Sequence, residues 1–389
     1  MMKNSKVSVV RIQEERIREA VASAVDLIGG MKAVVRPGEK VLLKPNWCVV
    51  PTDPKVGVVT NHFVVQAVAD LVKDAGAEPI ISDSAARGVD TDLVIEATGY
   101  GELRKQGYRV LNLKKEKTIR LRCPDAEILK EMKTFALVTE VDKIINIPLL
   151  KTHDSAEATL GLKNMKGLLH DDHKSKLHRK GLYAGVVDVN ARFTPDLVIF
   201  DGTWGLEGLG PMYGIPVKMD LILASRDVVA ADAVAGSVMG FAPEELLITK
   251  YAYDRGLGEM DLNRIEILGE KLESVTRRFK RVIEDDRILY ENVNIVHDKG
   301  TCTGCKVAIF SSLFDMKNKG ILDQAKGFTL ITGDVELPYG VPEHMMVFVG
   351  ICVPKSKRGK RWVKGCPPNN ADTIRAITGL GQKDTYATD

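Results

Sequence analysis

The fold is decided by one stretch with a strand–helix–strand pattern: KVLLK at residues 40–44, NHFVVQAVADLVKDAG at residues 61–76 and EPIISD at residues 78–83. The two outer runs are short and apolar, which is typical of buried strands. Asn61 favours the start of a helix and Gly76 its end, so the spacing predicts a helix between them. Two such strands joined by a helix predict parallel pairing, with the helix packed on the sheet.

The same alternation continues to about residue 285. Further strands are predicted at residues 143–148, 197–201 and 220–224, and Asp227 is expected to cap a helix that ends before Gly240. We therefore predict an α/β body over residues 1–285, with a mainly parallel sheet and helices on both faces.

The pattern changes after residue 285. Strands are predicted at residues 287–298, 328–332 and 345–349, with a helix that ends near Asn318. We predict a small C-terminal α+β module over residues 286–389, which bears four of the six cysteines.

Composition excludes several classes of protein. The 389 residues are 44% hydrophobic, enough to form a large and a small core. The 55 basic and 52 acidic residues leave a formal charge of +3, which is too balanced for a dedicated nucleic-acid binder. No apolar run is long enough to span a membrane, and the N-terminus lacks the features of an export signal. A cytoplasmic protein that binds neither nucleic acid nor membrane is expected.

The cysteines of the C-terminal part predict a metal centre. Cys302 and Cys305 form a C-x2-C pair, Cys352 follows, and Cys366 stands before Pro367. Four thiolates are the usual complement of one [4Fe–4S] cluster. Tetrahedral zinc also accepts four cysteines, but thirteen residues separate Cys352 from Cys366, where zinc modules usually have a second close pair. Zinc and unliganded thiols remain the alternatives, and buried packing is the preferred interpretation of the isolated Cys48 and Cys123.

Polar residues follow several predicted strands of the body, where the ligand sites of open parallel sheets lie. Lysine, threonine and asparagine side chains can hold a carboxylate or phosphate, and a histidine or carboxylate can move a proton. We predict substrate binding by Lys44, Asn46, Thr159, Asn164 and Glu207, and catalytic roles for Lys151, His153, Lys163 and Asp201. Residues 170–180 contain three histidines that could act as acid–base groups or metal ligands, but a solvated loop is the preferred interpretation of that run.

Two further segments have a distinctive composition. Six of the ten residues from Lys355 to Lys364 are cationic, which predicts a solvated loop or a docking surface for an acidic electron carrier. The glycine-rich segment 205–210 does not follow the first strand, and no Walker loop is present, so standard NAD or ATP binding is unsupported.

With these residues in view, the chain resembles the domain-of-unknown-function family numbered 362, an iron–sulfur-associated group of anaerobic bacteria and archaea. The resemblance implies an α/β body and a redox setting, but no reaction. Many relatives carry a C-x2-C-x2-C-x3-C-P insert, whereas only Cys302 and Cys305 begin such a pattern here, so one cluster is expected rather than two. The matching segments are 44–46, 148–153, 159–167, 188–190, 195–197, 201–202 and 227–232.

The function predicted from these features is that of an iron–sulfur redox enzyme. One cluster would relay electrons from a donor such as ferredoxin or flavodoxin to a small anionic substrate in a cleft lined by lysine and histidine. The alternatives are a non-redox, cluster-dependent lyase or hydratase, and a binding protein with a structural cluster or zinc. A homodimer is the assembly to test first, because two-fold dimers are the commonest oligomers.

Overall fold

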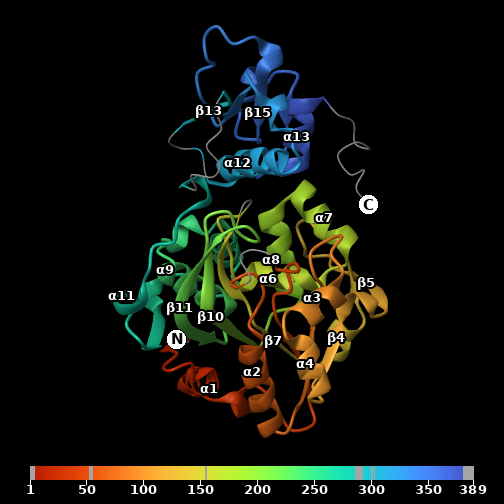
Figure 1. Ribbon diagram of the computed structural model, residues 1–389, viewed down its shortest axis with the longest axis vertical. Coiled ribbons are helices and arrows are strands. Elements are labelled where there is room, and N and C mark those ends of the chain that lie inside the picture. Colours follow the sequence, from red (N-terminus) through yellow and green to blue (C-terminus); the bar gives the residue numbers. More distant parts are fainter. Residues whose placement is uncertain are drawn as a thin grey trace.

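The structure is a computed structural model that describes residues 5–51, 56–153, 156–284, 292–298, 301 and 303–379. A large body carries a smaller C-terminal part at one end, and α12 (Thr303–Asn318) lies between them (Figure 1). The predicted boundary at residue 285 falls outside the described residues, and so do Cys302 and residues 287–291 of the predicted strand 287–298.

A single large sheet organises the body, and the predicted α/β fold class is confirmed. All of its pairings are parallel except those that β11 makes with β1 and β10 and the short pairing of β8 with β9. The main strands, in spatial order, are β12 (Ile265–Gly269), β1 (Ser5–Arg11), β11 (Ile215–Ser225), β10 (Leu197–Glu207), β7 (Lys143–Asn146), β2 (Lys40–Lys44), β3 (Glu78–Asp83) and β4 (Arg109–Asn112).

Helices cover both faces of this sheet because its strands are apolar on both sides. In β2, Val41 and Leu43 enter the core beneath α1 (Ile17–Leu27) and α2 (His62–Asp74), whereas Leu42 enters the opposite core. That second core packs against α6 (Gly161–Asn164), α8 (Leu182–Arg192), α9 (Val228–Val238) and α10 (Leu247–Asp254).

Two predicted helix caps are confirmed by their hydrogen bonds. The side chain of Asn61 accepts from the backbone N–H of Phe63 at the start of α2. The carboxylate of Asp227 accepts from the N–H groups of Val229 and Ala230 at the start of α9. These caps compensate for backbone donors that a helix leaves without an internal partner.

β10 and β11 are longer than predicted. They form an antiparallel hairpin whose register extends to Glu207 and Ile215, beyond the end of β7. The turn of this hairpin brings Pro211 and Met212 over the site described below. The glycine-rich segment 205–210 thus belongs to a strand end and a turn.

The C-terminal part contains a second sheet, all of whose pairings are parallel, in the order β13 (Asn294–His297), β14 (Thr329–Thr332), β15 (Met346–Val349) and β16 (Trp362–Val363). Its core joins α12 and α13 (Asn370–Thr378) to the sheet through Ile309, Leu330, Val347 and Ile374. The predicted small C-terminal sheet with helices is confirmed, whereas β16 lies in the segment predicted to be a loop.

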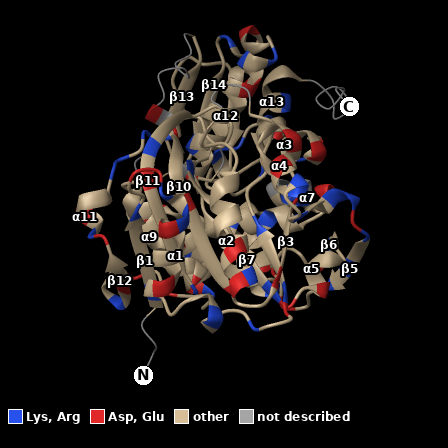
Figure 2. Cartoon of the chain, turned by 60° about the horizontal axis from the view of Figure 1, so that its bottom comes forward, with Lys and Arg blue, Asp and Glu red and all other residues tan. Residues whose placement is uncertain are grey.

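An apolar contact joins the two parts. Val307 of α12 packs with Leu209 and Val282 of the body, and the rings of Phe314 and Tyr213 are 5.5 Å apart. Acidic and basic residues are intermingled along the chain, as Figure 2 shows. No helix in the described ranges is long and apolar enough to cross a membrane.

Candidate functional site

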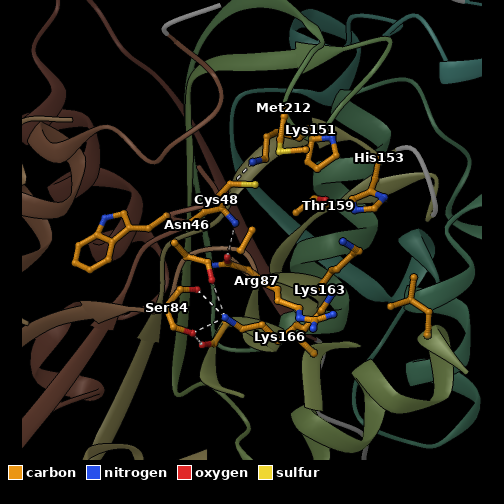
Figure 3. A pocket seen from close by; sticks show the side chains of 18 of the residues that line it. Asn46, Cys48, Ser84, Arg87, Lys151, His153, Thr159, Lys163, Lys166 and Met212 are labelled. Carbon is orange, nitrogen blue, oxygen red and sulfur yellow. Dashed lines mark hydrogen bonds between the residues drawn. The ribbon is translucent and has the colours of Figure 1, made fainter. Parts of the chain in front are cut away.

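A cavity of about 350 Å³ lies beyond the carboxyl ends of β2 and β3 and beside β8 (Leu149–Thr152) (Figure 3). This is the edge at which open α/β sheets bind ligands. The structure brings together there the predicted residues Lys44, Asn46, Lys151, His153, Thr159, Lys163 and Asn164. Six cationic residues and one acidic residue line the cavity within the described ranges, so it favours anions.

A chain of buried amides forms the floor. The Nζ atom of Lys151 donates to Oδ1 of Asn46 at 2.7 Å and to the carbonyl of Val58 at 2.9 Å. The Nδ2 atom of Asn46 donates to Oδ1 of Asn164 at 2.8 Å, and Asn164 donates in turn to Asn146 at 2.7 Å. Burial lowers the pKa of Lys151. The asparagines thereby orient a fully buried ammonium without neutralising its charge.

A buried ion pair supports the neighbouring loop. The Nζ atom of Lys44 lies 2.8 Å from Oδ1 of Asp83, and both side chains are almost completely buried. The other oxygen of Asp83 accepts from the N–H of Trp47 at 2.8 Å. Burial lowers the pKa of Lys44, although Asp83 opposes that shift. A methyl group at Gly167 would lie 2.3 Å from Oδ1 of Asp83, so glycine is needed for this close packing.

Lys174 is a pocket residue that sequence reasoning missed. It lies on α7 (Asp171–Lys180), and its Nζ atom donates to Oγ of Ser84 at 2.7 Å, to the carbonyl of Ala85 at 2.8 Å and to Asp171 at 3.1 Å. Burial lowers its pKa to about 8. Its residue type and the charged run around it gave no sign of this burial.

The histidine-containing run is a helix, and the predicted loop at residues 170–180 is wrong. His170 caps α7 by accepting from the N–H of Asp172, and Nδ1 of His173 accepts from the N–H of Lys133 at 2.9 Å. These bonds join α7 to the strand that contains Lys133, and neither ring lines the cavity. The side chain of His178 lies outside the described residues.

A short hairpin positions His153 and Thr159. Lys151 of β8 pairs with Thr159 of β9 (Ala158–Thr159), and the N–H of His153 donates to the carbonyl of Glu157 at 3.0 Å. His153 is 5% exposed and lines the cavity. The Oγ1 atom of Thr159 is buried and has no hydrogen-bond partner in the described part of the chain.

Two predicted site residues do not line the cavity. Asp201 accepts from the N–H groups of Asn61 and Thr203 at 2.7 and 2.9 Å, and burial raises its pKa. Asp201 lies on β10, where successive side chains point to opposite faces of the sheet. Its side chain lies on the face that carries α2 and contacts the residue at the start of that helix. Glu207 accepts from the N–H of Lys280 at 3.0 Å. Both carboxylates hold backbone segments, and this contact accounts for the burial of Asp201 without a catalytic role.

A third buried carboxylate also holds backbone. Asp232 of α9 accepts from the N–H groups of Gly161 and Leu162 at 2.7 and 3.0 Å, and burial raises its pKa to about 8. It therefore occupies the first free N–H groups of α6, beside the cavity.

Cys305, Cys352 and Cys366 lie at one end of the small sheet. Cys352 follows β15 and Cys366 follows β16, and these two segments are joined by a hydrogen bond from the N–H of Ile351 to the carbonyl of Gly365 at 3.1 Å. A methyl group at Gly350 would lie 2.5 Å from Sγ of Cys305. No group of three metal-binding side chains is arranged for a metal ion within the described residues, which do not include Cys302. Cys123 is buried in the body, and Cys48 lines the cavity.

The segment after Cys366 enters the cavity wall. Pro367, Pro368, Asn369 and Asn370 line the cavity, and Asn369 also caps α13 through the N–H of Ala371 at 2.8 Å. This contribution was not predicted, because nothing local to these residues indicates that they meet a pocket more than 150 residues away in the chain.

The basic segment 355–364 makes several contacts within the C-terminal part. Lys357 pairs with Asp334 at 2.6 Å, and the guanidinium of Arg358 lies 3.9 Å from the centre of the Trp362 ring. Arg361 donates to the carbonyl of Ile377 at 3.2 Å. These contacts account for half of the six cations in the segment.

The chain is similar to known proteins in sequence and in fold. A thylakoid-associated protein of Synechocystis sp. is 33% identical over 247 residues, which cover 61% of this chain and 75% of the relative. A lactate racemase apoprotein from Thermoanaerobacterium thermosaccharolyticum aligns with a TM-score of 0.40 and 10% identity, over 85% of this chain and 69% of that one. The family model called Domain of unknown function (DUF362) matches residues 41–237, a range that holds most of the cavity residues. The chain belongs to the DUF362 family.

Proposed function

We propose that this protein is an iron–sulfur redox enzyme in which Cys302, Cys305, Cys352 and Cys366 hold one [4Fe–4S] cluster beside an anion-binding cavity. When bound, such a cluster supplies single-electron transfer. The observation that carries the proposal is the continuity of the segment 366–370, which runs from a predicted ligand directly into the cavity wall.

The chemistry and spacing of the four cysteines support a cluster. Two of the cysteines follow adjacent parallel strands, and the buried Sγ of Cys305 approaches the glycine that stands two residues before Cys352. Cys302 is three residues before Cys305, the spacing at which two sulfurs reach one cluster from a single loop. The same four thiolates would also hold zinc, which is the competing occupant.

The contact between the two parts supports a short path from the cysteines to the cavity. A methyl group at Gly304, next to Cys305, would lie 2.5 Å from Oη of Tyr183 and 3.5 Å from Cβ of Pro367. Tyr183 belongs to the body and donates to Oε1 of Glu157 at 3.1 Å. Segments of the body and of the cysteine-bearing part therefore pack directly against each other.

In this proposal the cavity residues bind and orient an anionic substrate. Lys151 supplies a buried positive charge whose hydrogen bonds to described residues go to neutral oxygens, and Lys163 lies on the neighbouring wall. His153, buried at the end of β8, delivers the proton that accompanies electron transfer. The external donor is a small acidic carrier such as ferredoxin or flavodoxin, attracted by the exposed cations Lys355, Lys360 and Lys364. A cytoplasmic location and a homodimer remain predictions.

Anaerobic purification followed by iron, sulfide and zinc analysis tests the proposal. We expect about four iron and four sulfide per chain, and an EPR signal after reduction with dithionite. Replacement of Cys352 by serine should remove most of the bound iron, whereas Cys123→Ser, in the core of the body, serves as the matched control and should retain it. A colourless protein with one zinc per chain would overturn the redox function and favour the structural role.

The variant His153→Gln distinguishes a role of His153 in the reaction from a role in holding the fold and the cluster. The variant should keep the iron content and EPR signal of the unaltered protein while electron transfer to a bound substrate is lost. The lyase alternative requires one iron of the cluster that no cysteine binds. In that case one of the four cysteines is not a ligand, and its replacement by serine should leave the cluster intact.

A further inference from the structure

The charges that line the cavity divide into a deep group and a rim group. The deep cations are Lys44, Lys151 and Lys174, which are at most 6% exposed. Lys44 is paired with Asp83, Lys174 with Asp171, and Lys151 donates to neutral oxygens. Two of the three deep cations thus have carboxylate partners, and all three hold the loops of the pocket together.

Two of the three rim cations are accessible, and the third, Lys163, is buried. Arg87 is exposed, Lys166 is half-buried and Lys163 is 8% exposed, and all three line the cavity. They come from the loop after β3 and from α6 with the turn after it. Figure 3 shows the three side chains in the same part of the pocket, below Thr159 and apart from Lys151 and Cys48.

A buried hydroxyl adds a second, independent observation. Thr159 is 5% exposed and lines the same cavity, and its Oγ1 atom has no hydrogen-bond partner in the described ranges. A buried hydroxyl without a partner is energetically unfavourable, so an atom that accepts or donates a hydrogen bond there is favoured. The N–H groups of Gly161 and Leu162 cannot serve a ligand, because Asp232 occupies them.

We propose that the cavity takes a ligand with a phosphoryl group, held by Arg87, Lys163 and Lys166 with a hydrogen bond from the Thr159 hydroxyl. A phosphoryl group offers three terminal oxygens, each of which can accept a charge-assisted hydrogen bond from a lysine or arginine or a hydrogen bond from a hydroxyl. A carboxylate offers two oxygens and one charge, and would leave the group incompletely matched. This inference depends on the proposed function only in assigning the cavity as the substrate site.

Isothermal titration calorimetry on the full-length protein tests the assignment. Inorganic phosphate and pyrophosphate are titrated at fixed ionic strength, and acetate and malonate are titrated under the same conditions as carboxylate probes. Constant ionic strength is required because screening alone changes the affinity of exposed charges. We expect one saturable site for the phosphates, with at least about tenfold weaker binding of either carboxylate.

Variants locate the site. Arg87→Met and Lys166→Met lie at the accessible rim, so neither disturbs the core, and each should weaken pyrophosphate binding by about tenfold, which corresponds to the loss of one charge-assisted hydrogen bond. Thr159→Val, which conserves side-chain shape, should weaken it about threefold to tenfold. Lys32→Met, an exposed lysine outside the cavity, is the matched control and should bind as the unaltered protein does.

Equal or tighter binding of malonate would overturn the phosphoryl assignment and identify a dicarboxylate site. Phosphate binding that none of the rim variants weakens would also overturn it. Failure of the redox proposal is detected separately, because a protein that lacks iron would still bind pyrophosphate with the predicted dependence on Arg87 and Lys166.

Discussion

Lys151 donates from Nζ to Oδ1 of Asn46 at 2.7 Å, although the two residues are 105 positions apart in the chain. This bond joins the loop after β2 to the end of β8, and Asn46 continues the contact to Asn164 of α6. The three segments that carry the cavity are therefore coupled through one buried ammonium and two amides.

Removal of this acceptor should destabilise the fold. Asn46→Ala leaves the Lys151 ammonium with the Val58 carbonyl as its remaining acceptor among the described residues, and we expect a loss of about 1–3 kcal/mol in the free energy of unfolding, measured by urea titration. The exposed Asn263→Ala is the control and should change stability by less than about 0.5 kcal/mol. An Asn46→Ala variant as stable as the control would show that the bond contributes nothing.

Replacement of one partner of the buried ion pair between Lys44 and Asp83 should destabilise the protein more than replacement of both partners. Asp83→Ala leaves a buried ammonium without its carboxylate partner and should cost about 3–5 kcal/mol, whereas the double variant Lys44→Met with Asp83→Leu should recover most of that loss. Thermal and urea unfolding measure both.

The exposed pair of Lys105 and Glu102 provides the comparison. Its side chains are 71% and 64% exposed, and Glu102→Ala should change stability by less than about 1 kcal/mol. Equal losses for the buried and exposed pairs would contradict the role assigned to burial.

Stability should rise with pH above about 8 because of Lys174. Its pKa is lowered to about 8 in the folded protein from 10.5, so between these values the unfolded chain binds more protons than the folded one. The free energy of unfolding therefore increases with pH across this window, and below pH 8 the folded state bears the full cost of the buried charge.

Lys174→Met should flatten this part of the stability profile, measured by urea unfolding from pH 7 to 10.5. Lys44 and Lys151 also have lowered pKa values and contribute a slope of the same sign, so the difference between the two proteins isolates Lys174. Parallel profiles for the variant and the unaltered protein would show that Lys174 remains protonated throughout.

The elements that sequence reasoning placed correctly are those with local signals. β2 and β3 have the predicted bounds, because their apolar runs end at polar or turn-forming residues. α2 and α9 begin at the predicted caps, because an asparagine or aspartate side chain meets the N–H groups within its own turn. By contrast, the length of β10 depends on its pairing with β11, which no local pattern describes.

The candidate site was predictable only in part. Lys44, Asn46, Lys151 and His153 follow strands, and parallel strands end at a common edge of a sheet. Asp201 also lies on a strand, but the alternation along β10 directs it towards α2. Lys174 lies in a charged run that resembles a solvated loop, and its burial follows from the packing of α7 against the loop after β3.

The sequence by itself determined the strand and helix rhythm, the two helix caps and the cysteine spacing, because each depends on residues within a few positions of one another. The tertiary structure decided which polar residues share the cavity, and it brought residues 367–370 to the wall of a pocket built by the body. Such contacts depend on how two hydrophobic cores pack at long range, and that packing is not encoded in any single stretch of the chain.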